Sequence, residues 1–531
     1  MTFQARIDLQ ALQDSYVIFA ADYKKQLPSM RQILFSFSIF IITLFFVPNF
    51  LMAREIPQEM RGLWVSTVFN IDWPSRAGLD SQAQQAEAIA ILDQAEQLGL
   101  NTIFLQVRPA GDALYVSNLE PWSRFLSGRA GQPPYPFYDP LQFWIEQAHT
   151  RGLELHAWIN PFRASTGDNH QNFNHHNPDL KKWILQYGNQ NIFDPGAPEV
   201  RQHLLQVVAD LITRYDIDGL HLDDYFYPYP IWGTEFPDTL SFRLFGTGNP
   251  ATRNQWRREN INTVIETIHQ LVKQHKPWIK FGVSPFGVWR NRSSDPRGSD
   301  TRGGLESYDH LFADVLLWER MGWIDYVIPQ LYWHRQDNRA NFNVLLDWWN
   351  LTIRNRHLYI GHAVYKISGD DPVWKSPSEL PGQIRAVRDM NRPTGSVFFS
   401  QRHFNRNDLL GLQDTLHTNL FRMPAITPNM PWIDDTPPAP VINLRYHRGI
   451  VSWNTEQTDK PFDEARRFII FLDPVGPRAK ARGPVWFITG QTRFALPRRH
   501  FLTRSRYHLS VMPVDRLSNV GAVNTLYLIS F

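Results

Sequence analysis

Two neighbouring aspartates near the middle of the chain are the first candidates for chemistry. The segment Gly219–Asp223 alternates apolar and polar residues, which predicts a short buried strand with Leu220 and Leu222 on one face. In a parallel barrel the other face points into the lumen, so Asp223 is expected at the carboxyl end of the strand, where such barrels carry out their chemistry. The side chain of Asp224 would lie on the opposite face of the strand from Asp223, or Asp224 already lies beyond the end of the strand. A pair of aspartates that only forms a turn or binds an ion is the alternative.

The same alternation predicts polar side chains at the inner ends of other strands. A purely structural rim would be packed with apolar residues, so a ring of polar groups favours binding or catalysis. The ring that we expect at this rim consists of Gln106, Arg108, Asn160, Asp223, Gln330 and Tyr332, with Ser66 and Ser284 in equivalent positions.

Two long loops are expected to complete the cleft. One opens with Asn160-Pro-Phe-Arg163 after the third strand and runs to Asp194-Pro-Gly196. The other follows the fifth strand, carries Trp289 and Asn291, and runs to Asp300. Long loops at the catalytic face of a barrel usually build the substrate site, so we predict that Arg163, Trp289 and Asn291 contact the substrate.

The positioning elements follow from an alternation of strand-like and helix-like segments, repeated eight times between Glu59 and about His417. This pattern predicts an α/β fold, a (β/α)8 TIM barrel with enlarged loops. A doubly wound open sheet is the alternative, but no glycine-rich turn follows the first strand. The predicted strands are Arg61–Thr67, Thr102–Val107, Leu153–Ile159, Gly219–Asp223, Lys280–Ser284, Tyr326–Leu331, Leu358–Ala363 and Ser396–Ser400. The amphipathic stretches between them include Gln82–Leu98, Leu141–Arg151, Val200–Tyr215, Arg253–His275, Leu305–Met321 and Asn341–Arg354.

Composition excludes several classes of function. The 531 residues carry a net charge of only +3 without a block of Lys or Arg, which argues against nucleic-acid binding. The absence of cysteine excludes disulfides, thiolate catalysis and thiolate-bound metals. His170, His175 and His176 lack metal-ligand spacing and are interpreted as solvated loop residues. We therefore predict neither a metal nor a cofactor.

The N-terminus carries an apolar segment without charges from Ile33 to Val47. It is preceded by Arg31 and followed by a small residue, Ala53, which is the layout of a secretory signal. A membrane anchor would usually need about 20 apolar residues, so cleavage is expected and no membrane span should remain. Residues 1–29 precede a normal signal start at Met30 and are surplus. We expect the mature protein in the periplasm or cell envelope.

The composition changes after Phe421. Residues 422–440 are rich in proline and predict a stiff linker, which bounds the barrel region at 54–421. Residues 441–531 consist of short alternating runs typical of a small all-β sandwich, and Trp453 with the run from Tyr507 to Asp515 resembles a fibronectin type III domain. A barrel that ends near residue 425 is expected to fold alone. The predicted strands are Val441–Arg445, Ile450–Asn454, Phe468–Leu472, Trp486–Thr489, Arg493–Ala495, Tyr507–Pro513 and Asn524–Ile529.

A series of long motifs in the barrel region resembles the glycosyl-hydrolase-like family ten barrel over about residues 58 to 420. The resemblance implies a secreted glycosidase that acts on the glycan strands of peptidoglycan, with strands stripped of peptides as one candidate. It also places Tyr225 and Trp333 among the substrate contacts. The motifs include Met60-Arg-Gly-Leu-Trp-Val-Ser-Thr67, Gln106-Val-Arg-Pro109, His156-Ala-Trp-Ile-Asn-Pro-Phe-Arg163, Asp218-Gly-Leu-His-Leu-Asp-Asp-Tyr-Phe-Tyr227 and Pro329-Gln-Leu-Tyr-Trp333.

The fourth strand is also similar to the acidic signature of family-18 chitinases, but it departs from it. His221 replaces one aspartate, and Tyr225 stands where that family has its acid, so its substrate-assisted mechanism cannot be carried over. A conventional pair of carboxylates is the default: one protonates the leaving oxygen while the other attacks or activates water. Asp223 is one member, and the second is left open among Asp224, Asp194, Asp295 and Asp300. The catalytic assignment is Asp223, Asp224 and Asp300.

The sequence therefore predicts a secreted glycoside hydrolase whose partner is a glycan. The alternatives are a hydrolase of another extracellular polysaccharide, or a carbohydrate-binding barrel without catalysis. The bond cleaved, the stereochemistry, any protein partner and the oligomeric state do not follow from these residues.

Overall fold

A computed structural model describes residues 56–166, 178–246, 252–390, 392, 394–476, 483–497 and 506–530. The chain divides into two compact units, Met1–Ile56 and Pro57–Phe531, and every element described below belongs to the second. The predicted signal segment and the loop histidines His170, His175 and His176 lie outside the described residues. None of the helices in the described ranges combines the length and the apolar composition that crossing a membrane requires.

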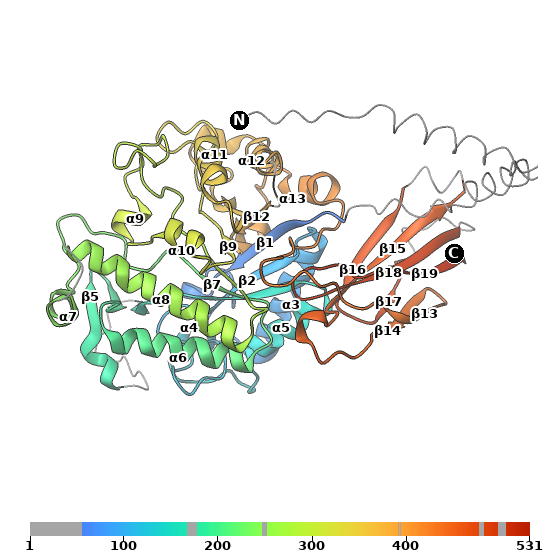
Figure 1. Cartoon of the computed structure of the whole chain (residues 1–531), viewed down its shortest axis with the longest axis horizontal. Helices are drawn as coiled ribbons and strands as arrows, with labels where there is room; N and C mark the ends of the chain where they lie inside the picture. The colour runs from blue at the N-terminus through green and yellow to red at the C-terminus, as the bar shows by residue number, and fades with distance from the viewer. Residues whose placement is uncertain are drawn as a thin grey trace, which may run out of the picture. The chain divides into compact units, whose positions relative to one another are not determined.

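A closed parallel sheet forms the centre of the second unit (Figure 1). Its order is β10-β9-β8-β7-β3-β2-β1-β12-β11, and β10 and β11 are one strand interrupted at Tyr359, so the sheet returns to its start and closes. The predicted (β/α)8 barrel is therefore confirmed. The strands are β1 (Glu59–Val65), β2 (Thr102–Arg108), β3 (Glu154–Ile159), β7 (Gly219–Leu222), β8 (Lys280–Val283), β9 (Tyr326–Val327), β10 (His357–Leu358), β11 (Ile360–Ala363) and β12 (Thr394–Phe399).

The helices that cover the barrel begin at recognisable caps. Asp139 accepts hydrogen bonds from the backbone N–H groups of Leu141 and Gln142, and Pro140 supplies a preset first turn. Asp80 and Thr252 cap two other helices in the same way. The principal helices are α3 (Ser81–Gln97), α5 (Pro140–Thr150), α6 (Pro198–Arg214), α8 (Arg253–His275), α10 (Val315–Met321), α11 (Phe342–Thr352) and α12 (Glu379–Arg388), of which α6 and α8 lie side by side in Figure 1.

Two predicted elements are shorter than the sequence suggested. The sixth strand, expected to reach Leu331, ends at Val327 because Pro329 has no N–H to donate to a neighbouring strand. The helix expected over Leu305–Met321 is broken into α9 (Ser307–His310) and α10, since the chain turns at Phe312 with a φ of 55°.

The alternation of side chains along the strands has the predicted sense. Ile103 and Leu105 of β2 join the core beneath the helices, whereas Phe104 points into the barrel. Inside the barrel Phe104 packs edge-on against His221 at 4.9 Å between ring centroids, and burial holds the pKa of His221 well below its usual value. The lumen is thus a packed core of neutral rings, which leaves only its rim for chemistry.

The C-terminal region is all β, as predicted. Two antiparallel sheets share one apolar core, in which Trp453 of one sheet packs on Phe468 of the other at 5.1 Å between ring centroids. Its likeness to a fibronectin type III domain remains a prediction. The sheets contain β13 (Ile442–His447), β14 (Ile450–Asn454) and β17 (Arg493–Ala495) in one, and β16 (Val485–Thr489), β15 (Arg467–Val475), β18 (Arg506–Val514) and β19 (Asn524–Ser530) in the other.

A buried cluster of charges joins this region to the amino-terminal end of the barrel. Glu154 at the start of β3 binds Lys280 of β8 at 2.6 Å and Arg467 of β15 at 2.9 Å. The two cations hold the pKa of Glu154 well below its usual value although burial opposes this. Arg467 thus supplies one of the two cations that stabilise the buried charge of Glu154, which ties the C-terminal region to the barrel.

The proline-rich segment between the two parts is docked along the barrel. The backbone N–H of Glu59 donates to the carbonyl of Ile426 at 2.9 Å, and Trp432 donates from its indole to Asp325 at 3.0 Å. Leu517, from a loop of the C-terminal sheets, is fully buried in the same apolar cluster as Phe104. A chain ending near residue 425 would lose the contacts of Trp432 and Leu517, and that such a chain folds alone stays a prediction.

Replacing Leu517 with alanine should lower the free energy of unfolding by about 2–5 kcal/mol, because a fully buried leucine would leave a cavity at the end of the barrel. Leu351→Ala is the matched control, since Leu351 is 65% exposed and its loss should change stability by no more than about 0.5 kcal/mol. Urea denaturation of the purified proteins measures both. Equal stability of the two variants would mean that the 515–519 loop is not part of the barrel core.

Candidate active site

A cavity of about 450 Å³ opens at the carboxyl ends of the barrel strands. Side chains from every strand, or from the loop that follows it, reach this cavity, so a closed barrel is required to assemble it. Aromatic rings dominate its walls, which suits the apolar faces of sugar rings. Its lining consists of Trp64, Ser66, Val68, Ile71, Gln106, Trp158, Arg163, Asp223, Asp224, Tyr225, Tyr229, Ser284, Phe286, Gln330, Tyr332, Trp333, Tyr365, Lys366 and Phe399.

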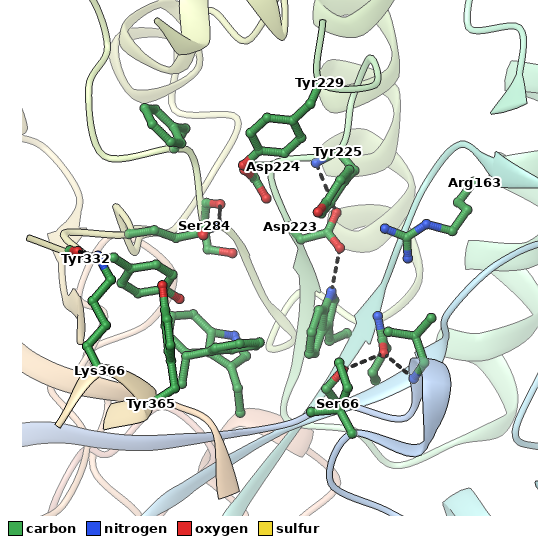
Figure 2. Close-up of a pocket in the computed structure, with 18 of the residues that line it drawn as sticks. Ser66, Arg163, Asp223, Asp224, Tyr225, Tyr229, Ser284, Tyr332, Tyr365 and Lys366 are labelled. Atoms are coloured by element: carbon green, nitrogen blue, oxygen red, sulfur yellow. Dashed lines mark hydrogen bonds between the residues drawn. The ribbon is translucent and has the colours of Figure 1, made fainter. Parts of the chain in front are cut away.

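Asp223 is held in the cavity wall by three N–H donors, and Figure 2 shows it beside one of them, Tyr225. Its Oδ2 accepts from Trp158 Nε1 at 3.0 Å and from Asn160 Nδ2 at 3.1 Å, and its Oδ1 accepts from the backbone N–H of Tyr225 at 3.2 Å. Burial, and then the charge of Asp224, raise the pKa of Asp223 to about 6, while these donors oppose the rise. The side chain is thus a carboxyl group that titrates near neutral pH.

Asp224 lies in the same cavity. The strand ends at Leu222, so the chain has already turned and the side chain of Asp224 is only 3% exposed. Its Oδ2 accepts a hydrogen bond from the hydroxyl of Tyr229, and burial raises its pKa. Because two adjacent buried carboxyl groups repel each other when both are charged, they titrate as a pair.

Asn160 connects this pair to a cation. Its amide N–H binds Asp223, while its Oδ1 accepts from the backbone N–H of Arg163 at 2.9 Å. The guanidinium of Arg163 stacks on the ring of Tyr225, 4.6 Å from its centroid, and favours the charged forms of Asp223 and Asp224. Arg163 therefore limits the rise in pKa that burial imposes on the aspartates.

Eight of the predicted site residues line the cavity. Both Asp223 and Asp224 do so, which removes the expected contrast between them. Gln106 is oriented by its Oε1, which accepts from Ser66 Oγ and from the N–H groups of Thr67 and Val68 at 2.9–3.1 Å. The eight residues are Gln106, Arg163, Asp223, Asp224, Tyr225, Gln330, Tyr332 and Trp333.

Two predicted substrate contacts lie behind the cavity wall. Arg108 is 1% exposed and forms a two-pronged ion pair with Glu120 at 2.5–2.7 Å, and it also donates to the carbonyl of Pro161 at 3.2 Å. Asn160 is fully buried and touches Asp223 rather than the cavity. Neither side chain lines the cavity, and both hold neighbouring groups in place; their role as substrate contacts stays a prediction.

The loop after β8 does not supply the predicted contacts. Trp289 is 1% exposed and stacks on Trp348 at 5.7 Å between ring centroids. Asn291 is held by Glu306, whose Oε1 accepts from its backbone N–H at 2.7 Å. Asp300 does not line the cavity: its side chain is 74% exposed and pairs with Arg292 at 3.6 Å. The loop packs outward against α11, so these three assignments find no support in the geometry.

The other two candidates for the second carboxylate also lie elsewhere. Asp295 is bound at 2.8 Å by both Arg290 and Arg297, and Asp194 accepts from the N–H of Gly196 at 2.8 Å within a turn. Neither lines the cavity. Of the carboxylates that were left open as partners of Asp223, only Asp224 is in place.

The cavity residues that were not among the predicted contacts include Tyr229, Phe286, Tyr365 and Lys366. Tyr365 and Lys366 directly follow β11, so the rule that loops after barrel strands carry function could have found them. Tyr229 is one of several tyrosines that follow Asp224. Its position in the sequence did not indicate that it, rather than a neighbour, would line the cavity. No group of three or more His, Cys, Asp or Glu side chains suited to a metal occurs in the described parts of the chain.

Comparison with known proteins identifies the family to which this site belongs. The model of the family described as glycosyl hydrolase-like 10 matches residues 59–376. The chain belongs to this family. It is 43% identical over 412 residues to the glycosyl hydrolase YngK of Bacillus subtilis (strain 168), covering 76% of this chain and 80% of YngK.

The glycosyl hydrolase DigH of Escherichia coli (strain K12) is a second relative. It is 37% identical over 381 residues, which cover 67% of this chain and 85% of DigH. A solved structure, the PgaB (BpsB) glycoside hydrolase domain from Bordetella bronchiseptica, matches with a TM-score of 0.46 and 13% identity, covering 67% of this chain and 99% of that domain. This member of the glycosyl hydrolase-like 10 family is a glycosidase.

Replacing either aspartate of the pair with asparagine should lower kcat about a hundredfold or more, because the amide keeps the shape but can neither carry the charge nor transfer the proton. Asp300→Asn is the control, since its exposed side chain lies outside the cavity, and it should keep full activity. Rates of glycan hydrolysis and thermal unfolding of each variant check this. Full activity of Asp223→Asn or Asp224→Asn would exclude that aspartate from catalysis.

The value of kcat/KM should fall as the pH rises above about 6, because the aspartate pair then loses the proton that must reach the leaving oxygen. Trp158→Phe removes a donor that favours the charged form of Asp223. The pKa of the pair should therefore rise, and the alkaline limb of the profile should move to higher pH. Profiles of kcat/KM against pH for both proteins measure the shift, and an unmoved limb would mean that another group titrates.

Proposed function

We propose that this glycosidase is a cell-envelope enzyme that hydrolyses the glycan strands of peptidoglycan. The proposal is supported by the resemblance of its barrel motifs and by the character of the cavity. Peptidoglycan strands alternate N-acetylglucosamine with N-acetylmuramic acid, whose lactyl group carries a carboxylate once the stem peptide is removed. A site for such strands needs aromatic walls, a pair of acids and a cation that is available to the substrate.

The position of Lys366 in the cavity is the observation that favours peptidoglycan as the substrate. It lines the cavity on the wall formed by Tyr332 and Tyr365, away from Arg163 (Figure 2). Its Nζ donates to the carbonyl of Tyr332 at 2.6 Å, and an ammonium group has two further N–H donors. Burial lowers the pKa of Lys366, so its charge is incompletely hydrated. A substrate carboxylate would restore the missing stabilisation, whereas an uncharged polysaccharide would not.

Arg163 is less suited to this task, because it lies beside the aspartates and its charge already acts on them. The two cations thus have separate functions in the proposal. Arg163 tunes the acids, and Lys366 recognises the acidic sugar. Hydrolysis of another extracellular polysaccharide is the second candidate, and it would leave Lys366 without a partner in the substrate.

Lys366→Met should raise KM for peptidoglycan strands stripped of stem peptides and leave KM for uncharged chito-oligosaccharides unchanged, because only the former present a free lactyl carboxylate. Lys366→Arg keeps the charge and is the matched control. Purified peptidoglycan with and without stem peptides is digested, and mass spectrometry identifies the new reducing ends. No release from either preparation, or an equal effect of Lys366→Met on both substrates, would refute the assignment.

The charge-free segment Ile33–Val47 supports a location outside the cytoplasm. We propose that it directs export and is removed, so that the mature chain begins near Arg54 outside the cytoplasmic membrane. Amino-terminal sequencing of the protein from the envelope fraction measures this. An intact Met1 on protein recovered from the cytoplasm would contradict it.

A further inference from the structure

The cavity contains an unusual set of carboxylates. Among the residues that the structure describes, its lining has two, Asp223 and Asp224, and they are consecutive in the chain. Glycosidases that use two protein carboxylates place them on opposite sides of the scissile bond, about 5–5.5 Å apart for retaining enzymes and about 6.5–9.5 Å apart for inverting ones. Both aspartates here enter the cavity from the end of one strand, β7 (Figure 2).

The wall that faces them offers no replacement within the described ranges. Figure 2 shows Tyr332, Tyr365 and Lys366 on this side, and the rest of the lining adds the hydroxyl of Ser66 and the ring of Phe399. None of these groups is a carboxylate that could attack the anomeric carbon or activate a water molecule. If a sugar occupies this cavity, the protein can act on it with acids from one side only.

The two aspartates differ in what their neighbours allow. The partners of Asp223 are the N–H donors of Trp158, Asn160 and Tyr225, so this carboxyl group is held as an anion that can still accept another hydrogen bond. Asp224 accepts from the hydroxyl of Tyr229, which can rotate to donate or accept, and also has the side chain of Gln330 as a neighbour, so fewer fixed N–H donors hold it as an anion. The shared proton is therefore assigned to Asp224 and the negative charge to Asp223, because Asp223 has three fixed N–H donors, although the charge of Asp224 by itself raises the pKa of Asp223.

We propose that the enzyme cleaves glycosides of 2-acetamido sugars by substrate assistance: the acetamido oxygen of the substrate is the nucleophile, Asp224 the acid and base, and Asp223 the acceptor for the acetamido N–H. This inference rests on the proposed glycosidase site and adds the class of sugar that must occupy the position where the bond breaks. It also corrects the sequence-based default of two opposed carboxylates.

The first step breaks the bond between the anomeric carbon and the leaving oxygen. The acetamido oxygen forms a new bond to the anomeric carbon from the opposite side, and the proton of Asp224 passes to the leaving oxygen. Asp223 accepts the hydrogen bond, and then the proton, of the acetamido N–H, which yields a neutral oxazoline. The charge on Asp223 offsets the positive charge that develops on this group.

The second step hydrolyses the oxazoline. Water adds to the anomeric carbon from the side that the leaving group has vacated, and Asp224 takes one of its protons. The bond between the anomeric carbon and the acetamido oxygen breaks, and Asp223 returns the proton to the nitrogen. The acetamido group is regenerated, the net reaction consumes one water molecule, and two inversions give a product with retained configuration.

The departure from the family-18 pattern is consistent with this arrangement. Tyr225 occupies the position where that family has its acid, and its backbone N–H and its ring hold Asp223 and Arg163 instead. The acid function moves to Asp224, one residue earlier. Both sugars of peptidoglycan carry the 2-acetamido group, so the inference is compatible with the proposed substrate without depending on its lactyl group.

The test varies the nucleophile and leaves the protein unchanged. Stripped peptidoglycan strands and, in parallel, chito-oligosaccharides are N-deacetylated and then re-acylated with acetyl, fluoroacetyl or trifluoroacetyl groups. Fluorine withdraws electrons from the carbonyl oxygen with little change in size. We expect kcat to fall progressively with each fluorine and to be lost for the trifluoroacetyl glycan, with a smaller effect on KM. Nuclear magnetic resonance of the fresh product should show the retained anomer.

Azide distinguishes the roles of the two aspartates. With an activated aryl glycoside of a chito-oligosaccharide, Asp224→Ala in azide should form a glycosyl azide of retained configuration, because the acid and base is missing but the oxazoline still forms. Asp223→Ala should form no azide of inverted configuration. An inverted glycosyl azide from Asp223→Ala would identify Asp223 as a protein nucleophile and would overturn the inference.

The outcomes separate this inference from the proposed function. Cleavage of peptidoglycan strands with kcat independent of fluorination, or with an inverted product, overturns substrate assistance and leaves the proposed function standing. Fluorine-dependent cleavage of chito-oligosaccharides alone supports substrate assistance and refutes peptidoglycan as the substrate. Failure to cleave either N-acetylated glycan overturns both.

Discussion

A buried carboxylate that is held by side chains of the neighbouring strand is the feature on which the site depends. The parallel register pairs Trp158 with His221 and Ile159 with Leu222, and one step further along it brings Asn160 beside Asp223. A shift of one residue in this register would turn the indole and amide donors away and leave the charge of Asp223 without partners, at a cost of several kcal/mol. The closed barrel therefore both positions Asp223 and supplies the hydrogen-bond donors that stabilise its charge.

The buried charged groups of the barrel lie at its two ends. Its interior is filled with packed rings of Phe104, His221 and Tyr326, which separate the acidic site at one end from the ion cluster at the other. At the site end, Asp223 and Asp224 have raised pKa values because burial outweighs the influence of Arg163. At the opposite end Glu154 has a lowered pKa because two cations outweigh burial. Similar degrees of burial thus have opposite effects, according to the partners that each carboxylate meets.

The period-2 pattern was sufficient to predict the barrel, its strands and the inward side chains nearest the strand ends, such as Gln106 and Asp223. Predictions became unreliable where the chain leaves the strands. Trp289, Asn291 and Asp300 belong to a loop that packs back onto α11 through the Trp289–Trp348 stack, and such a contact between distant segments has no local signal in the sequence. Arg108 was wrongly placed in the cavity because parity cannot show that a buried Glu120 would capture it.

The position of Arg467 has a consequence for the synthesis of the chain. Glu154 and Lys280 are translated long before Arg467, which supplies the second cation of their cluster from the C-terminal sheets. Leu517, which completes the apolar cluster at the same end, is made later still. A nascent chain that has already produced all of its barrel strands therefore still lacks the groups that seal their amino-terminal end. Closure of this end of the barrel therefore has to wait until Arg467 and Leu517 of the C-terminal region have been synthesised.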